Sequence, residues 1–240
     1  MYTRDEAFLR DRAVPFMREV ALFYEDYLLR DEEGCVLVVP SNSPENAPSE
    51  DIAGEVDLSV MMNPGVPLTI NSTIDTALVR ELLGNLCEAY DTLGLPQADT
   101  AVWHDIVAHL RPFRINEDGA LAEWIHSDHH DNYAHRHLSH IYPVFPGFQI
   151  TKEEQPELFE ATRVAMEKRM SIGLEAQTGW SLAHQAGIYA RMGEAAKVQT
   201  CFDLLARTCV GANLFTYHND WRNMGVTLRV SLGKGGAVPG

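Results

Sequence analysis

The sequence predicts an all-α protein in which antiparallel helix pairs support long loops that carry the chemistry. Apolar residues recur at helical spacing through most of the 240-residue chain, and Gly, Pro or a polar cap ends each periodic segment. Polar and aromatic residues gather between these segments, above all in residues 119–150. Paired helices whose loops emerge on one side favour an α/α toroid with a central cleft.

The first helical segment opens at residues 3–6 and stops before Gly34, and its apolar residues from Phe8 to Leu28 form one broad face. Pro15 interrupts it, so we expect a break or kink there, with Pro15 in the first turn of the second piece. A short β-type run follows at 35–39. Residues 40–67 are rich in Pro, Ser, Asn and Gly, which predicts a rigid turn at 40–46 and then a long loop.

Five further helices follow from the same signals. They are predicted at 73–93, ended by Gly94; at 99–110, stopped by Pro112; at 156–170, begun by Pro156; at 180–192, capped by Thr178 and closed by Gly193; and at 194–208, the antiparallel partner of the preceding helix. Residues 212–240 mix loop and strand signals. We interpret residues 1–240 as a single domain.

The composition excludes two classes of partner. A net charge of −15 argues against nucleic acid, whose binding needs a basic surface, and against an anionic membrane. It fits a neutral substrate. No apolar run reaches the length of a membrane span, and the charged N-terminal residues do not resemble a leader. The four cysteines form no CxxC pair and favour reduced thiols, which predicts a cytoplasmic protein.

Residues 119–150 hold six of the ten histidines. Neutral imidazole is a common metal ligand, so a metalloenzyme is one interpretation. However, no HExxH motif is present, and Asn132 and Pro143 make a single helix across the cluster doubtful. We expect these histidines and Arg136 to donate hydrogen bonds to substrate hydroxyls and backbone carbonyls, with no metal and no cofactor.

Two glutamates are candidate general acids, because apolar surroundings can raise the pKa of a carboxyl group into the working range. Glu45 lies in the rigid turn between Pro44 and Asn46, and Glu123 precedes Trp124. By position alone, a solvated or salt-bridged glutamate is the commoner outcome for either. The HNDWR segment at 218–222 is likewise more often a structural ion-pair corner than a catalytic one.

Several segments together resemble a known family. PSNSPEN, TIDTALVRELL, GALAEW, HRHLSHIYPVFPG, TGWSLAHQAGIYARMG and NLFTYHNDWR occur in this order and at this spacing. They resemble glycoside hydrolase family 95, the α-1,2-L-fucosidases and related α-L-galactosidases. The HRHLSH and SPEN blocks are the most specific, and the resemblance covers essentially the whole chain.

This resemblance implies part of an (α/α)6 barrel and inverting hydrolysis of a terminal α-linked fucosyl or galactosyl residue. One carboxylic acid would protonate the leaving oxygen while a base directs water from the opposite face. The glutamate of the SPEN block, Glu45, is our choice for the acid, and Glu123 is the runner-up. The remaining site residues that we expect to bind substrate are Arg136, His137, Glu123, Asn46 and Trp124.

The departures from the family pattern concern the base. The QIDGN-type block with the water-activating Asp and the early NxN pair are absent from these 240 residues. Asp220 is a possible substitute base. We expect the chain to be a piece of a larger enzyme. The chain carries the acid half of the site, so we expect it to take part in hydrolysis only within that enzyme and to be inactive in isolation. The alternatives are a carbohydrate-binding module without catalysis and the His-rich metalloenzyme.

Overall fold

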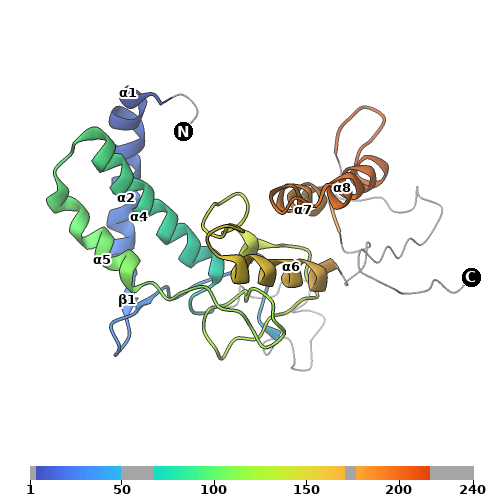
Figure 1. Cartoon of the computed structure of the whole chain (residues 1–240), viewed down its shortest axis with the longest axis horizontal. Helices are drawn as coiled ribbons and strands as arrows, with labels where there is room; N and C mark the ends of the chain where they lie inside the picture. Colours follow the sequence, from blue (N-terminus) through green and yellow to red (C-terminus); the bar gives the residue numbers. More distant parts are fainter. Residues whose placement is uncertain (1–3, 50–67, 171–176, 217–240) are drawn as a thin grey trace, which may run out of the picture.

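A computed structural model describes residues 4–49, 68–170 and 177–216 and is mostly helical (Figure 1). The helices are α1 (Glu6–Phe8), η1 (Leu9–Ala13), α2 (Val14–Tyr27), α4 (Thr73–Leu93), η3 (Gln97–Thr100), α5 (Ala101–His109), η4 (Ser139–Ile141), α6 (Pro156–Met170), α7 (Gly179–Arg191) and α8 (Ala195–Thr208). The helical segments predicted after residue 68 are therefore confirmed to within about two residues at each end, apart from the start of α5.

The all-α prediction needs one correction. β1 (Leu29–Arg30) and β2 (Val36–Leu37) form a two-stranded antiparallel sheet in which Leu29 lies opposite Leu37. The β-type run at 35–39 supplies the second strand. It pairs with the end of the α2 segment because the intervening turn reverses the chain at Gly34, whose φ of +81° suits glycine.

Pro15 lies in the first turn of α2, as predicted. The expected break takes the form of a π-helical stretch, η1, immediately before it, where the Val14 N–H donates to the Leu9 carbonyl five residues back. Proline cannot donate an amide hydrogen and its ring crowds the preceding turn. The wider π turn accommodates both effects without ending the helix.

The residues that the structure describes contain two large hydrophobic cores and a small cluster between α7 and α8. One joins α2, β2, α4 and α5 through buried side chains that include Val36, Leu83, Leu86, Tyr90, Trp103 and Ile106. The other joins residues 120–150 to α6 and α7 through Leu121, Leu138, Ile141, Ile150, Met166 and Ile188, among others. Figure 1 shows α2, α4 and α5 at one end, α7 and α8 at the other, and α6 between them.

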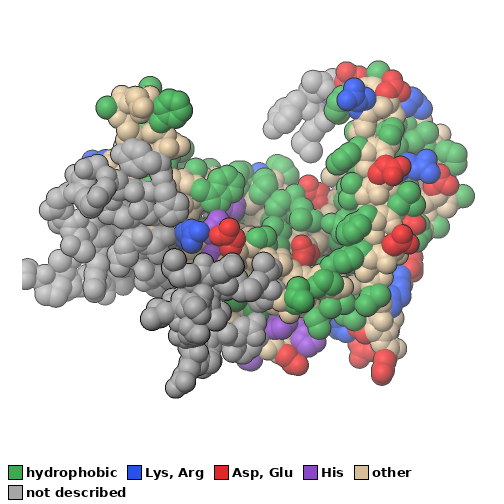
Figure 2. Space-filling model, turned by 180° about the vertical axis from the view of Figure 1, so that it is seen from behind, with side chains coloured by type: hydrophobic (Ala, Val, Ile, Leu, Met, Phe, Trp, Pro, Cys, Tyr) green, Lys and Arg blue, Asp and Glu red, His purple; other side chains and the backbone are tan. Residues whose placement is uncertain are grey.

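Large hydrophobic side chains are exposed along α1 and α2, namely Phe8, Phe16, Leu22 and Phe23. Figure 2 shows hydrophobic side chains gathered at the edge of the molecule that these helices form. None of the helices in the described ranges is long and apolar enough to cross a membrane. The predicted loop at 50–67, most of the segment after 212, and Asp220 lie outside the described residues.

Candidate active site

The turn at 41–46 exposes its Pro44–Glu45 tip to solvent and buries Ser43 and Asn46 on either side of that tip. The Ser43 and Asn46 side chains are fully buried, whereas 70% of the Glu45 side chain is exposed. The Asn46 N–H donates to the Ser43 carbonyl over 2.7 Å, which closes the turn. Glu45 therefore projects from a tight turn that is held in place by the buried residues Ser43 and Asn46.

The N-terminus of α4 anchors this turn. Ser72 caps the helix, and its backbone N–H donates to Ser41 Oγ over 2.8 Å. Asp75, in the first helical turn, accepts from Ser41 Oγ over 2.7 Å and from the Asn42 N–H over 3.1 Å. An acidic side chain is favourable at a helix N-terminus, so Asp75 stabilises the helix and the turn together.

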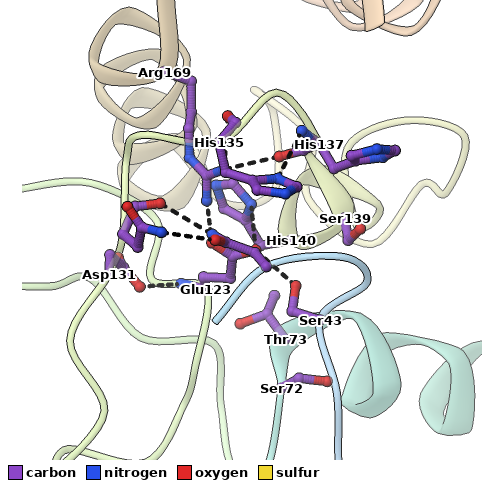
Figure 3. A network of polar contacts seen from close by, with 12 residues as sticks. Ser43, Ser72, Thr73, Glu123, Asp131, His135, His137, Ser139, His140 and Arg169 are labelled. Atoms are coloured by element: carbon purple, nitrogen blue, oxygen red, sulfur yellow. Dashed lines mark hydrogen bonds and ion pairs between the residues drawn. The ribbon is translucent and has the colours of Figure 1, made fainter. Parts of the chain in front are cut away.

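Glu123 lies beneath the turn and is 1% exposed. Its carboxylate accepts from Ser43 Oγ over 2.7 Å and from Asn46 Nδ2 over 2.6 Å, and it forms an ion pair with Arg169 of α6 (Figure 3). Burial raises the pKa of the Glu123 carboxyl, and the guanidinium of Arg169 opposes this shift. With these partners, Glu123 belongs to the buried support of the turn.

A second loop, residues 131–140, completes the support. Asp131 Oδ1 accepts from the Glu123 backbone N–H over 2.8 Å, and the Asn132 carbonyl accepts from Asn46 Nδ2 over 3.0 Å. Arg169 Nη1 donates to the His135 and His137 carbonyls. The turn and the loop thus share one buried polar network, which Figure 3 shows beneath α6.

At the surface, the same loop places Arg136 and His137 beside Glu45. Arg136 Nη2 lies 3.4 Å from Glu45 Oε2, and His137 Nε2 lies 3.5 Å from the same oxygen. Burial and the nearby Arg136 lower the pKa of His137, whereas Glu45 opposes that shift. Residues 91 positions apart in the sequence therefore meet in one exposed group with a carboxylate, a guanidinium and an imidazole.

Comparison with known proteins identifies the family. Residues 1–227 match the glycosyl hydrolase family 95 catalytic domain. The chain belongs to this family. It is 32% identical over 193 residues to Alpha-L-fucosidase 2 of Arabidopsis thaliana, covering 80% of this chain and 21% of that protein. It is 24% identical over 198 residues to Probable alpha-fucosidase A of Aspergillus niger, covering 79% of this chain and 23% of that protein.

This chain of glycosyl hydrolase family 95 spans about a fifth of the length of the curated relatives it matches. The prediction of the family from the SPEN and HRHLSH blocks is confirmed. The two blocks supply the turn with Glu45 and the loop with Arg136 and His137, so the segments that identified the family are also those that meet in space.

The histidines of residues 119–150 differ in burial, and burial lowers the pKa of His135 and His140. His140 is 1% exposed, and burial together with the charge of Arg169 holds its pKa well below the ordinary value, so the ring stays neutral. Burial lowers the pKa of His135 to about 3. Within the described ranges, the one group with metal-binding geometry is Asp31, Glu33 and Cys35 near the β1–β2 turn, which contains no histidine.

The predicted substrate-binding residues separate into two levels. Glu45, Arg136 and His137 reach the surface, whereas Asn46 and Glu123 lie below it. The Trp124 side chain, also predicted to contact substrate, is completely buried, and its Nε1 donates to Thr69 Oγ1 over 3.1 Å. Its indole therefore has no surface to offer a sugar in this structure, and its predicted role has no geometric support.

Sequence reasoning overlooked Arg169, Asp131 and Ser43. A signal for Arg169 existed. The buried residues of α6 include Phe159, Thr162, Met166 and Arg169, spaced by three, four and three positions. This is the spacing of one helix face, so the period already placed Arg169 on the buried face of α6. A charge on such a face needs a buried partner, which the structure identifies as Glu123.

Proposed function

We propose that this chain forms the acid side of an inverting glycoside hydrolase site within an (α/α)6 barrel. The enzyme removes a terminal α-L-fucosyl or α-L-galactosyl residue from a neutral glycan. Glu45 acts as the general acid, and Arg136 and His137 bind sugar hydroxyls. The observation that carries this proposal is the meeting of Glu45 with Arg136 and His137 at the surface, 3.4 and 3.5 Å away.

The geometry favours Glu45 over Glu123 for the acid. A general acid must come within hydrogen-bond reach of the leaving oxygen, about 2.6–3.2 Å between heavy atoms. Glu45 is exposed and can make that approach, whereas Glu123 has all its near neighbours inside the protein. Arg136 and His137 supply N–H donors within reach of the same position, which suits a ligand rich in hydroxyl oxygens.

The substrate class follows from charge and from relatives. A chain with a net charge of −15 attracts no polyanion, and an uncharged glycan avoids the repulsion that an acidic substrate would meet. Both curated relatives are named as α-fucosidases, which supports a fucosyl residue as the first substrate to test. Inversion places the base and its water across the sugar ring from Glu45, with the carboxyl groups about 6.5–9.5 Å apart.

The test compares Glu45→Gln with a matched control. Glu117→Gln alters a glutamate that is 75% exposed and lies 3.3 Å from Arg114, so it reproduces the surroundings of Glu45 closely. Both variants are made in the longer enzyme of which we expect this chain to be a piece, because that enzyme supplies the base. Hydrolysis is followed on 2′-fucosyllactose and on p-nitrophenyl α-L-fucoside. We expect Glu45→Gln to lower turnover of the oligosaccharide about 10²–10⁴-fold and that of the aryl glycoside much less, since an activated leaving group needs little protonation.

We expect the control variant Glu117→Gln to hydrolyse both substrates at the wild-type rate. An equal loss on both substrates in Glu45→Gln would remove Glu45 from the acid role. If the longer enzyme binds fucose by saturation-transfer NMR but hydrolyses neither substrate, and Arg136→Met abolishes that binding, the carbohydrate-binding alternative would be favoured instead. Activity lost on chelation and restored by zinc would contradict the prediction of a metal-independent site.

A further inference from the structure

We propose that Arg169 is a positioning residue that locks the Glu45 turn to the loop carrying Arg136 and His137. Its guanidinium contacts the loop directly, at the His135 and His137 carbonyls, and reaches the turn through Glu123 (Figure 3). The inference rests on the proposed function, because positioning has a catalytic meaning only if Glu45, Arg136 and His137 act on a sugar.

On the loop side, Arg169 fixes the backbone around Arg136. Nη1 donates to the His135 carbonyl over 3.1 Å and to the His137 carbonyl over 2.8 Å. These carbonyls belong to the residues immediately before and after Arg136. Two bonds to one nitrogen hold both sides of this residue, and so direct the Arg136 side chain toward Glu45.

On the turn side, Arg169 acts through Glu123. Nη2 pairs with Glu123 Oε2, and the same carboxylate accepts from Ser43 Oγ and Asn46 Nδ2. Ser43 and Asn46 flank the Pro44–Glu45 tip. Each surface segment is therefore held on both sides of its functional residue, and the two sets of bonds meet in a single ion pair.

The burial of this pair argues for a geometric role. Arg169 is 2% exposed and Glu123 is 1% exposed. Replacing a buried ion pair by apolar side chains is often neutral for stability, so stability alone does not require these charges at this position. A planar guanidinium holds its donors in fixed directions on separate nitrogens, whereas lysine donates from a single nitrogen at the end of a flexible stem. The contacts of Arg169 use two nitrogens, Nη1 for the carbonyls and Nη2 for the carboxylate.

The support for Arg169 is itself rigid. α6 packs into the core through Phe159, Ala165 and Met166, all buried. Its last turn carries Arg169 into the network, so the position of the guanidinium follows from core packing. Catalytic groups displaced by about 1 Å can lose about 10²-fold in rate, which makes such a rigid support significant for Glu45.

The experiment uses four variants of the 240-residue chain: Arg169→Met, Arg169→Lys, the double variant Glu123→Leu/Arg169→Met, and Arg163→Met as control. Arg163 lies on the same helix but pairs with Glu160 and Glu194. Hydrogen–deuterium exchange is measured at residues 41–47 and 133–140, with α4 and α5 as internal references. The titration of His137 is followed by NMR.

We expect exchange in both segments to rise together by about tenfold or more in Arg169→Met and less in Arg169→Lys, with α4 and α5 unchanged. Burial and the charges of Arg136 and Arg169 lower the pKa of His137, so the loss of charge in Arg169→Met would raise that pKa by itself. The informative variant is Arg169→Lys, which keeps the charge, and there too the pKa of His137 should move up as the loop loosens. In the double variant, the urea midpoint should recover toward that of the wild type while both segments still exchange fast. Arg163→Met should match the wild type.

Three results would overturn the proposal: wild-type exchange in both segments of Arg169→Met, a uniform rise that includes α4 and α5, or full recovery of protection in the double variant. The Lys and double variants keep the test valid if Arg169→Met does not fold. Neither readout requires turnover. A failure of Glu45→Gln to affect hydrolysis would therefore reject the proposed function while leaving the mechanical link between the two segments standing.

Discussion

Two glutamate–arginine pairs lie one above the other in this protein, and they differ in almost every respect except chemistry. Glu45 and Arg136 meet at the surface at 3.4 Å, with 70% and 32% of their side chains exposed. Glu123 and Arg169 meet below them with 1% and 2% exposed. The upper pair joins two segments loosely, and the lower pair joins the same two segments through four hydrogen bonds and one ion pair.

The difference shows how environment divides roles between identical residue types. An exposed pair contributes about 0–1 kcal/mol to stability and is free to exchange its partner for a ligand. Breaking a buried pair by removing one member costs about 3–5 kcal/mol, because the other charge is left without compensation. The upper pair is therefore suited to chemistry and the lower pair to holding geometry. Four predictions test this division.

The largest expected effect is on stability when the lower pair is broken. Glu123→Leu leaves Arg169 buried without a carboxylate and should lower the free energy of unfolding by about 3–5 kcal/mol in urea denaturation. The same change at the surface, Glu45→Leu, is the control and should cost less than about 1 kcal/mol. A loss below about 1 kcal/mol in Glu123→Leu would mean that the lower pair is solvated and that the comparison fails.

The packing of α7 against Phe145 should be the next most sensitive feature when stability is measured. A Cβ added at Gly187 would lie 2.6 Å from Phe145 Cζ, and the Phe145 ring in turn contacts His184. Gly187→Ala should therefore cost about 1–3 kcal/mol through overpacking.

Gly84→Ala on α4 is the control for that change, because a Cβ there meets nothing within 4 Å. An exposed helical glycine replaced by alanine should gain about 0.5–1 kcal/mol. The two variants would be compared by thermal unfolding, and a stabilised Gly187→Ala would show that α7 does not press on Phe145.

The pH dependence of stability should reflect His135, which belongs to both levels. Its carbonyl accepts from Arg169, and its Nδ1 accepts from the His137 N–H over 3.1 Å, which a protonated ring could not do. Burial lowers its pKa to about 3, so between about pH 6.5 and 3 the unfolded chain binds a proton that the folded chain does not. The contribution of the neutral His135 ring to the free energy of unfolding is fully present above about pH 6.5 and is lost as the pH falls toward 3.

His135→Asn should remove that contribution. The slope of unfolding free energy against pH should become shallower by up to about 1.4 kcal/mol per pH unit within this window, since one proton is no longer taken up on unfolding. Urea titrations of both proteins from pH 7 to 4 would measure the difference. Parallel curves would mean that His135 titrates normally in the folded state.

The smallest effect should come from Glu45→Gln. This variant breaks only exposed contacts, and its free energy of unfolding should stay within about 0.5 kcal/mol of the wild type. Glu45→Gln should therefore change stability very little and turnover of the oligosaccharide strongly, which is the result expected if the upper pair serves chemistry and not stability. A destabilisation as large as that of Glu123→Leu would show that the upper pair is structural too.

Much of the architecture was predictable from the sequence, because local signals fix local structure. The apolar period and the caps at Ser72 and Gly94 place α4, and the Thr178 capping box places the start of α7. The family followed from ordered motifs, and two of those motifs supply the surface group of Glu45, Arg136 and His137. Helix propensity and motif identity act over a few residues, so one sequence suffices to read them.

The distinction between the two glutamates required the tertiary structure. In the sequence, Glu45 and Glu123 were both candidate acids beside apolar neighbours, and Trp124 was a candidate sugar contact. The structure buries both Glu123 and Trp124, which are at most 1% exposed, and leaves Glu45 at the surface. Arg169 meets Glu123 across 46 positions of the chain. The helical period places Arg169 on the buried face of α6, but its partner is fixed only when distant segments pack together, and no local pattern of residues specifies that pairing.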